Sequence, residues 1–425
     1  LRLALEEASE MKLVSVLLVS LLLVSAGHAS VPAKHIALKS EIETRALRYF
    51  LDHAHPVTGL VRDKADAFGP TPSQNIVASI AATGFGLAVV ANAADRGLIS
   101  RSDGEAYALR VLRFSEGNLT RHKGWFLHFV DWSTGSRIWK SEVSTIDTAL
   151  FLAGALYAGE VLGGEVKLIA NRLYEAVDFH EFMTDGGRRP GKRTLSLSYT
   201  PESGFSSFQW SQYAEQMILL VLGLGHPTHP LPEECWDVWR RQSFPVPWLS
   251  VMAVEMPLFI HQYSHAFLDF RSFSDGYASY FENSVRATRV HRVYAGTTAV
   301  YRTLREGFWG FSAGESPTGY SVYSPLNFRG TVCIGCAVAS AMFLPHEVLD
   351  DAEGWRSGSR SKEIWGIYGF IDGLDLDRKW ASRNVLGITV GPAYMAMANA
   401  EDSTSIWRKF MRIEGVKRGL ERAAR

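Results

Sequence analysis

Glu215 stands in the stretch "QWSQYAEQMILLVLGLG", directly ahead of an apolar run that would fill every face of a helix. Ser211 is a possible N-cap of that helix, which would place Glu215 too deep in the first turns to act as a cap. Helical steps from this glutamate lead to Ile218, Leu219 and Leu222. Burial beside apolar and aromatic groups raises a carboxyl pKa, which suits a general acid near neutral pH. A structural glutamate paired to an arginine inside the fold is the alternative.

Two more carboxyl groups, those of Glu142 and Asp147, flank the start of the apolar segment "STIDTALFLAGALYAG". Ser144 and Asp147 have the spacing of a capping box, so Asp147 is either a helix cap or a functional carboxylate. Glu142 precedes that helix start, where the helix dipole favours an ionised carboxylate, although a solvated loop glutamate would also fit. A carboxylic acid with a raised pKa and a second, ionised carboxylate are the two groups that glycoside hydrolysis requires.

Two histidines, His261 and His265, stand one helical turn apart in "HQYSHAFLDFR". This stretch lacks the glutamate of an HExxH zinc motif, so we predict no metal site here. Gln262, Asp269 and Arg271 share the stretch. Together with the histidines, they could hydrogen-bond sugar hydroxyls or support the core.

Aromatic side chains gather near the carboxyl-bearing segments. Trp139 precedes Glu142 by three residues, and Trp210 and Tyr213 lie just ahead of Glu215. Flat aromatic faces suit pyranose rings, so we take these three aromatic residues as candidate substrate-binding residues. Core packing would explain any one of them equally well.

Two kinds of helical segment alternate along the chain. One kind is apolar or small on every side and must be buried all round, whereas the other has a charged face for water. Six such pairs predict an all-α (α/α)6 toroid, a double ring of alternating inner and outer helices. An α-solenoid would need a repeat of constant length, which the chain lacks. The inner segments are 75–94, 144–159, 211–225, 257–270, 331–343 and 387–400, the outer ones are 101–117, 165–179, 232–242, 276–294, 346–356 and 404–420, and a further helix over 41–54 precedes the ring.

The start of the chain has the pattern of a cleaved signal peptide. A short apolar core over 13–25 follows Lys12, and small residues stand at Gly27 and Ala29. The core is too short to span a membrane comfortably. We interpret residues 1–10, ahead of the first Met, as upstream translation. We therefore expect an exported protein, periplasmic or secreted, with a single domain over 30–425 and no membrane contact after cleavage.

Charge and cysteine content bear on which partners, metals and cofactors are expected. Lys plus Arg and Asp plus Glu both number 44, so the net charge is zero and nothing predicts a nucleic-acid partner. Cys333 and Cys336 form "CIGC", for which a local disulfide or simple packing is expected over zinc. We expect no cofactor and a monomeric protein.

Twelve short segments, in order from Leu60 to Met411, resemble the glucoamylase-like domain family, which includes glycoside hydrolase family 144, the bacterial β-1,2-glucanases. Among them are "GLVRD", "GWFLHFVDWSTGSR", "SEVSTIDTALFLAGAL", "QWSQYAEQMILLVLGLGHPTHPL", "PLFIHQYSHAFLDFR", "WGFSAGESPTGY" and "IYGFIDGLD". The resemblance implies an (α/α)6 hydrolase that cleaves β-1,2-linked glucan with inversion.

The resemblance also assigns roles to matching positions. Glu215 matches the general acid proposed for the family, and Glu142 and Asp147 match its "SExSTID" carboxylates. Our hypothesis is that Glu142 is the base or a base-positioning group. The matching segments place the remaining candidate substrate-binding residues at Asp131, His261, Gln262, His265, Asp269, Arg271, Trp309, Tyr320 and Asp372.

The chain departs from the family pattern at two places. Relatives tend to read "ASDGPxGY" where residues 313–320 read "AGESPTGY", so an Asp is missing and Glu315 stands one position on. The "CIGC" stretch replaces a segment where relatives more often carry proline. Both loops are expected to border the funnel, so internal or terminal cleavage and substrate length stay open.

Two other classes of function remain. A polysaccharide lyase on the same toroid would want several Arg or Lys in the funnel to neutralise a uronate, and the inner segments carry almost none. A non-catalytic glycan-binding protein would keep the aromatic residues and need no acid. The presence of Glu215 favours the hydrolase.

Overall fold

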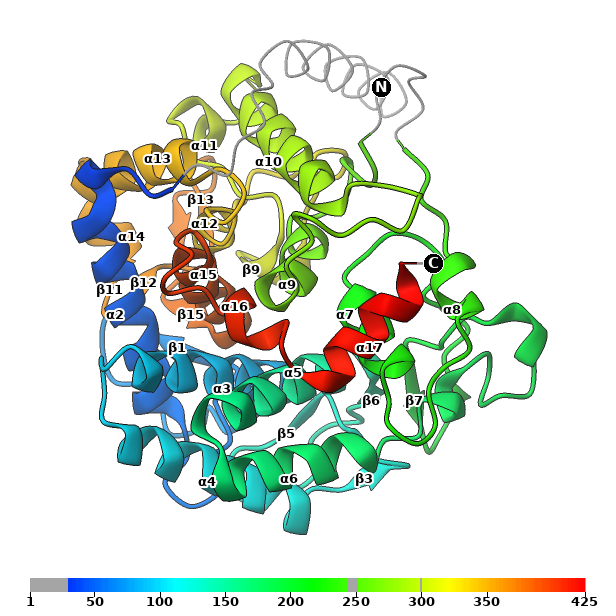
Figure 1. Ribbon diagram of the computed structural model, residues 1–425. Helices are drawn as coiled ribbons and strands as arrows, with labels where there is room; N and C mark the ends of the chain where they lie inside the picture. The colour runs from blue at the N-terminus through cyan, green and yellow to red at the C-terminus, as the bar shows by residue number, and fades with distance from the viewer. Residues whose placement is uncertain (1–29, 244–250, 299, 425) are drawn as a thin grey trace.

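Six inner helices form a closed ring in the computed structural model, which describes residues 30–243, 251–298 and 300–424 (Figure 1). Ring neighbours α3 and α5, α5 and α7, α7 and α9, α12 and α15, and α15 and α3 pack against each other. Gln262 on α9 completes the circle by donating to the Cys336 carbonyl on α12. The inner helices are α3 (Ile80–Asp95), α5 (Thr145–Leu162), α7 (Met217–Leu224), α9 (Phe259–Phe267), α12 (Ile334–Val338) and α15 (Gly387–Asn399).

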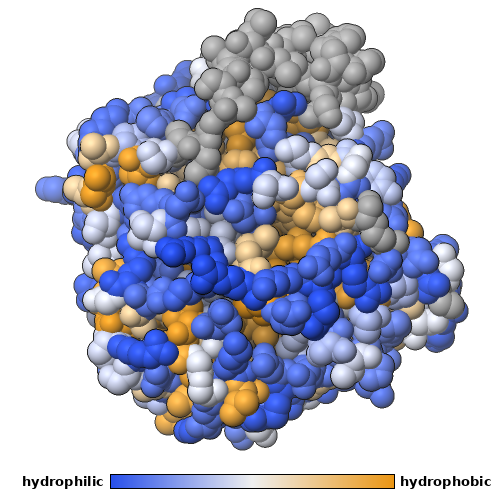
Figure 2. All heavy atoms as spheres, in the orientation of Figure 1, coloured by the Kyte–Doolittle hydropathy of each residue, from blue (hydrophilic) through white to orange (hydrophobic). Residues whose placement is uncertain are grey.

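The outer helices each cover an inner neighbour, which confirms the predicted (α/α)6 toroid. Helix α2 packs against α15 and α3, α4 against α3, and α6 against α5. Farther along the chain, α10 packs against α9, α13 against α12, and α17 against α7. Figure 2 shows a surface on which hydrophilic residues are widespread and apolar residues form scattered patches, and the charged faces of outer helices belong on such a surface. The outer helices are α2 (Ile36–His53), α4 (Arg101–Asn118), α6 (Gly164–Glu175), α10 (Tyr280–Thr297), α13 (Pro345–Ser357) and α17 (Glu414–Ala423).

Three details of the ring differ from the sequence prediction. The helix expected to precede the ring is α2, which is itself an outer helix between α15 and α3. The segment 232–242 forms only the four-residue helix α8 (Glu234–Asp237), and the outer position beside α7 is filled by α17 from the end of the chain. Helical periodicity predicts where helices form, but it does not predict which inner helix a segment at the end of the chain packs against.

Glycines allow α3 and α5 to approach closely. A Cβ atom added at Gly154 would lie 1.9 Å from the carbonyl oxygen of Gly84, and one added at Gly84 would lie 2.4 Å from the Cα of Phe151. These two inner helices therefore touch backbone to backbone, which explains the small residues in their sequences.

Short antiparallel strands lead into three of the inner helices. Strands β2 (Val77–Ser79), β6 (Val143–Ser144) and β15 (Asn384–Leu386) run directly into α3, α5 and α15, and they pair with β5 (Phe129–Asp131), β7 (Ser198–Thr200) and β1 (Lys64–Asp66). Strands β9 (Ala313–Ser316) and β10 (Gly319–Val322) form a hairpin. This strand framework surrounds the N-terminal ends of the inner helices, so it fixes the side chains that lie there.

The remaining elements are short connections. They are η1 (Ala33–His35), η2 (Phe179–Phe182), η3 (Pro190–Lys192), α11 (Arg302–Arg305), α14 (Ser361–Ile364), α16 (Trp407–Phe410), β3 (Arg121–His122), β4 (Trp125–Phe126), β8 (Gly204–Phe205), β11 (Trp365–Gly366), β12 (Gly369–Phe370), β13 (Leu374–Asp375) and β14 (Trp380–Ala381).

Among the described residues, α5 alone is long and apolar enough to cross a membrane by length and composition. In the fold, 83% of it is buried, as expected for an inner helix of the ring. The predicted signal peptide, residues 1–29, lies outside the described residues.

Candidate active site

A cavity of about 900 Å³ opens where α3, α5 and α15 begin. Its volume lies within the range of small-molecule sites. Backbone N–H groups at the start of a helix favour negative charge, and five carboxyl groups line this space. They belong to Asp63, Glu142, Asp147, Glu215 and Glu315.

Glu215 reaches the cavity from a turn that precedes α7, not from inside a helix. The expected helix start near Ser211 is wrong because α7 begins only at Met217. Ser264 of α9 holds the turn: its hydroxyl donates to the Glu215 carbonyl at 2.6 Å and accepts from the Ile218 amide at 3.0 Å. Burial raises the pKa of Glu215 to about 7, and the negative charge of Asp147 adds to the increase.

His128 lies between two of the carboxylates. Its Nδ1 is 2.8 Å from Glu142 Oε1, and its Nε2 is 3.5 Å from Asp147 Oδ1. Burial alone would lower the pKa of His128, but the charges of Asp147 and Glu142 outweigh it and raise this pKa to about 9. The hydrogen bond from His128 in turn lowers the pKa of Glu142. At neutral pH, a protonated His128 imidazole is therefore paired with an ionised Glu142 and lies beside the Asp147 carboxyl group.

Asp147 also takes part in the predicted helix cap. Its amide donates to the hydroxyl of Ser144 at 3.3 Å, and that hydroxyl donates back to the Asp147 carboxylate. Ser144 is thus the N-cap of α5, and Asp147, in the first turn, hydrogen-bonds to this cap and also lines the cavity.

Glu315 is held by a dense set of donors. Lys64 lies 2.7 Å from Oε1, Ser382 donates to Oε2 at 2.6 Å, and Asn384 donates to both oxygens. Burial would raise the pKa of Glu315, but these donors lower it on balance. Glu315 is thus an ionised carboxylate with its hydrogen-bonding capacity largely used.

Asp63 also faces the cavity, and it was not among the predicted site residues. Burial raises its pKa to about 6, and nearby His128 moderates the increase. The segment "GLVRD" ends on Asp63 and "GWFLHFVDW" contains His128, so the family resemblance covered both positions. Nothing in their local spacing indicated that they would meet, because they come from different connections of the ring.

Five of the predicted site residues line the cavity: Glu215, Glu142, Asp147, Trp139 and Tyr320. Trp139 and Tyr320 have exposed fractions of 73% and 57%. Trp139 adopts a φ of 49°, which is unusual for a bulky residue, and its ring packs edge-on against Phe129. The cavity therefore has aromatic surface available at its border.

The predicted residues of α9 point into the protein instead. His261 donates from Nε2 to the Ala253 carbonyl at 3.2 Å, and Gln262 donates to the Cys336 carbonyl and the Ser340 hydroxyl of the neighbouring chain segment. His265 is fully buried and packs against Phe270 and Phe343. Burial lowers the pKa of His261 to about 4 and that of His265 to about 3. These three residues do not line the cavity.

Two aromatic candidates near Glu215 are also interior. Trp210 donates from Nε1 to the Thr145 hydroxyl at 2.9 Å, and the Tyr213 hydroxyl lies 3.4 Å from that of Ser284. Both side chains are buried and neither lines the cavity. Their role in this structure is to support the turn that carries Glu215.

The other predicted residues outside the cavity have structural partners. Asp131 accepts from the amides of Ser133 and Thr134 and so closes a turn. Asp269 binds Arg271 at 2.7 Å, beside the Trp407 ring, and Trp309 donates to Asp351. Asp372 is fully buried behind β9, where it accepts from the Glu315 amide at 2.6 Å and from Thr389 at 2.7 Å.

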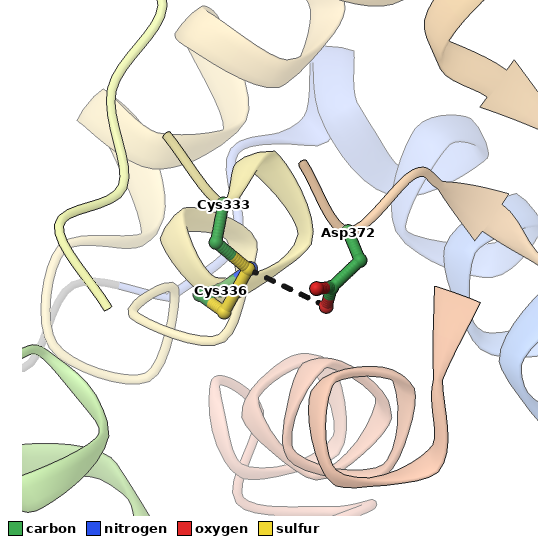
Figure 3. Close-up of side chains that lie close together, drawn as sticks. All are labelled: Cys333, Cys336 and Asp372. Atoms are coloured by element: carbon green, nitrogen blue, oxygen red, sulfur yellow. Dashed lines mark hydrogen bonds between the residues drawn. A yellow bond between two sulfur atoms is a disulfide. The ribbon is translucent and has the colours of Figure 1, made fainter. Parts of the chain in front are cut away.

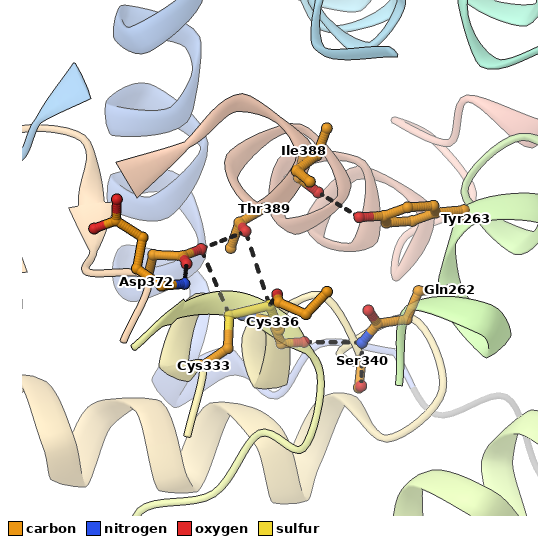
Figure 4. Close-up of a disulfide and its surroundings, with 10 residues drawn as sticks. Gln262, Tyr263, Cys333, Cys336, Ser340, Asp372, Ile388 and Thr389 are labelled. Atoms are coloured by element: carbon orange, nitrogen blue, oxygen red, sulfur yellow. Dashed lines mark hydrogen bonds between the residues drawn. A yellow bond between two sulfur atoms is a disulfide. The ribbon is translucent and has the colours of Figure 1, made fainter. Parts of the chain in front are cut away.

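The two cysteines of "CIGC" form a disulfide beside Asp372 (Figure 3). Among the described residues, only Cys333, Cys336 and Asp372 bring three possible metal-ligand atoms within 4.8 Å of one another. Both sulfurs are joined to each other, so they are not thiolate ligands in this structure. Figure 4 shows that the cluster is packed around Thr389 and Gln262 at the base of α12 and α15. Cys235, the other cysteine, is buried as a free thiol.

Comparison with known proteins confirms the glucoamylase-like resemblance. Residues 207–414 match the Glycoamylase family, described as "Putative glucoamylase". A curated relative, the exo β-1,2-glucooligosaccharide sophorohydrolase (non-reducing end) of Parabacteroides distasonis, is 22% identical over 90% of this chain. The aligned region spans only 57% of that relative.

Solved structures share the whole ring. The endo-β-1,2-glucanase of Chitinophaga pinensis, in complex with sophorotriose and glucose, is 26% identical, with a TM-score of 0.81 over 91% of this chain and 97% of that one. The β-1,2-glucanase of Parabacteroides distasonis is 21% identical, with a TM-score of 0.83 over 92% of this chain and 60% of that one. The second similarity concerns the fold alone.

Proposed function

We propose that this chain is a glycoside hydrolase that cleaves β-1,2-glucan or its oligosaccharides. The observation that carries the proposal is the contrast inside one cavity: Glu215 has a pKa raised to about 7, whereas Glu142 has a lowered pKa. A carboxylic acid and an ionised carboxylate in one site are the pair that glycoside hydrolysis requires. The named activities of the relatives described above support β-1,2-glucan as the substrate class.

In the proposed reaction, Glu215 donates its proton to the glycosidic oxygen as the bond from that oxygen to the anomeric carbon breaks. Water forms the new bond from the opposite face and gives a proton to a second carboxylate. Glu215 ends ionised and the second carboxylate ends protonated, so one water is consumed and the anomeric configuration inverts. An inverting pair needs carboxyl groups roughly 6.5–9.5 Å apart to leave room for that water.

The cavity walls suit a sugar chain. Phe129, Trp139, Tyr263 and Tyr320 present rings to the space, while the carboxylates offer acceptors to sugar hydroxyls. We propose that the exposed Trp139 and Tyr320 contact glucose units beside the cleaved bond.

The charge of the cavity bears on the alternatives. A lyase acting on a uronate would need positive charge around the substrate carboxylate, but five carboxyl groups face only Lys64, Lys140 and His128 here. Two of these three cations are already paired with the carboxylates. A glycan-binding protein without catalysis would have no use for a buried carboxyl that stays protonated near neutral pH.

Glu215→Gln tests the hydrolase directly, because it removes the proton donor with little change in shape. We expect kcat/KM on linear β-1,2-glucan to fall about 10²–10⁴-fold, the usual contribution of a general acid. Binding of the glucan, measured by calorimetry, should be retained. The matched control is Glu105→Gln, at an exposed glutamate of α4 that pairs with Arg101, and it should keep full activity.

NMR of the first product completes the test. An α-anomer released from the β-linked glucan would support inversion. Unchanged sugar release by Glu215→Gln would remove the hydrolase assignment, and a wild-type protein that binds the glucan without cleaving it would favour a binding protein.

A further inference from the structure

The five cavity carboxyl groups differ in how much of their hydrogen-bonding capacity is already used. Glu142 and Asp147 share the ring nitrogens of His128, and Asp147 also accepts from Ser144. Glu315 accepts from Lys64, Ser382 and Asn384. Each of these three carboxylates is thereby held in place, which makes it a poor acceptor for a proton from water.

Asp63 has the opposite arrangement: its backbone is fixed and its carboxyl group is unengaged. The Asp63 amide donates to the Val77 carbonyl at 2.9 Å, and its own carbonyl accepts from Gly387 at 2.9 Å and from the Tyr49 hydroxyl at 3.1 Å. Within the described part of the chain, no hydrogen bond or ion pair involves its side-chain oxygens. A rigidly mounted, unengaged carboxylate that lines the cavity is available to a bound water.

Glu215 is the cavity carboxyl group most similar to Asp63: within the described residues its side chain makes no hydrogen bond to another side chain, and its own backbone amide is its hydrogen-bond donor. The segments that carry these two residues are far apart in the ring: Asp63 lies between the start of α3 and the start of α15, whereas Glu215 precedes α7. Two carboxyl groups without side-chain partners, presented by separate sectors of one cavity, are the arrangement that an acid and a base on opposite faces of a sugar need.

The groups around Asp63 keep it suitable for this task. His128 and Lys64 are the cations that act on it, and Glu315 and Asp147 are the nearby anions. Burial is the largest cause, the cations offset part of it, and the pKa of Asp63 is left at about 6. A base with this pKa is ionised at neutral pH but still basic enough to accept a proton, whereas Glu142, with its lowered pKa, is a weaker base.

We propose, on the basis of the hydrolase function above, that Asp63 is the general base and that Glu142 is a positioning residue. The Asp63 carboxylate takes a proton from water while the water oxygen bonds to the anomeric carbon. The bond from that carbon to the leaving oxygen breaks, and Glu215 protonates the leaving oxygen. Glu142 and Asp147, joined through His128, form a negatively charged part of the cavity lining that orients the sugar and the water.

Azide rescue tests this assignment, because a small anion can enter the space left by a missing base and needs no deprotonation. We expect Asp63→Ala to lose about 10²–10⁴-fold in kcat/KM, as for loss of a general base. Sodium azide should then restore part of the rate and yield a glycosyl azide of the α configuration. Glu142→Ala should lose activity without forming the glycosyl azide, because the proposed base, Asp63, is still present in that variant.

Further variants separate catalysis from folding. Asp63→Asn is nearly isosteric and should be inactive with an unchanged melting temperature, whereas Asp95→Asn, at a surface aspartate paired with Lys409, should be fully active. The proposal is overturned if either Asp63 variant keeps wild-type activity, if azide rescues Glu142→Ala instead, or if azide rescues neither. A wild-type protein without activity on β-1,2-glucan would instead refute the hydrolase function on which the proposal rests.

Discussion

Glu215 and Glu142 are the same residue type in the same cavity, yet their surroundings push their pKa values in opposite directions. Burial without a charged partner raises the pKa of Glu215, while the hydrogen bond from His128 lowers that of Glu142. Nearby charges and desolvation are separate causes, and each of these glutamates is dominated by a different one. The division of roles in the site therefore arises from neighbours and not from residue type.

The rate should depend on pH with two limbs. Glu215 must be protonated to act as an acid, so activity should fall as pH rises through about 7. Asp63 must be ionised to act as a base, so activity should fall as pH drops through about 6. A profile of kcat/KM from about pH 3 to 9 on a β-1,2-gluco-oligosaccharide would reveal both limbs. An acidic limb well below pH 4.5 would instead favour Glu142, whose pKa lies lower.

At the scale of single elements, the position of Glu215 depends on the junction between a turn and a helix. Ser264 of α9 bonds both to the Glu215 carbonyl and to the first turn of α7, so two inner helices jointly define where the acid sits. The same holds for the start of α5, where Ser144 caps the helix and Asp147 lines the cavity. Close packing of the inner helices is thus a condition for the geometry of the site.

Gly154→Ala should disturb this packing, because a Cβ atom would collide with the Gly84 carbonyl of α3. We expect a loss of about 1–3 kcal/mol in unfolding free energy, as for overpacked cores. Urea denaturation followed by circular dichroism would measure it.

Gly117→Ala is the matched control, since a Cβ atom at Gly117 in α4 meets nothing within 4 Å. This change should be neutral or stabilise the protein by about 0.5–1 kcal/mol, because alanine favours helix over glycine. Equal destabilisation by both substitutions would show that the contact between α3 and α5 is not as tight as described.

At the scale of the whole molecule, the ring is completed by segments distant in the chain. Helix α2 lies between α3 and α15, and α17 packs against α7 so closely that a Cβ atom at Gly419 would lie 2.0 Å from the Val221 carbonyl. Glu215 lies in the turn that leads into α7, so the end of the chain supports the helix that follows the proposed acid.

Removal of residues 414–425 should therefore weaken both stability and activity. The truncation removes Val416 and Leu420 of α17, which are buried in the intact fold. Burial of each such side chain contributes about 1.5–3 kcal/mol to the free energy of unfolding. We expect a lower urea midpoint and a parallel loss of kcat. Glu414→Ala, at an exposed position of the same helix, should change neither. A truncated chain with the wild-type midpoint would contradict this role of α17.

Local patterns in the chain were enough to indicate the ring and three of its cavity carboxyl groups. The alternation of all-apolar and amphipathic segments depends only on helical periodicity, and Glu142, Asp147 and Glu215 stand beside helix starts that the pattern marks. Periodicity says which residues share a helix face. It does not say whether that face meets a cavity or another helix, which is why His261 and His265 lie in the interior.

The three-dimensional packing alone showed that Asp63 and His128 lie with the predicted carboxyl groups, and it brought Glu315, whose loop was expected to border the funnel, into the same cavity. These residues come from connections far apart in the chain, and their meeting depends on how strands β1, β5 and β9 are set around the ring. Their protonation is likewise a property of the assembled site, because desolvation and neighbouring charges exist only once the chain has folded. Residue types and local spacing therefore specify which groups are available, and long-range contacts specify which of them act together.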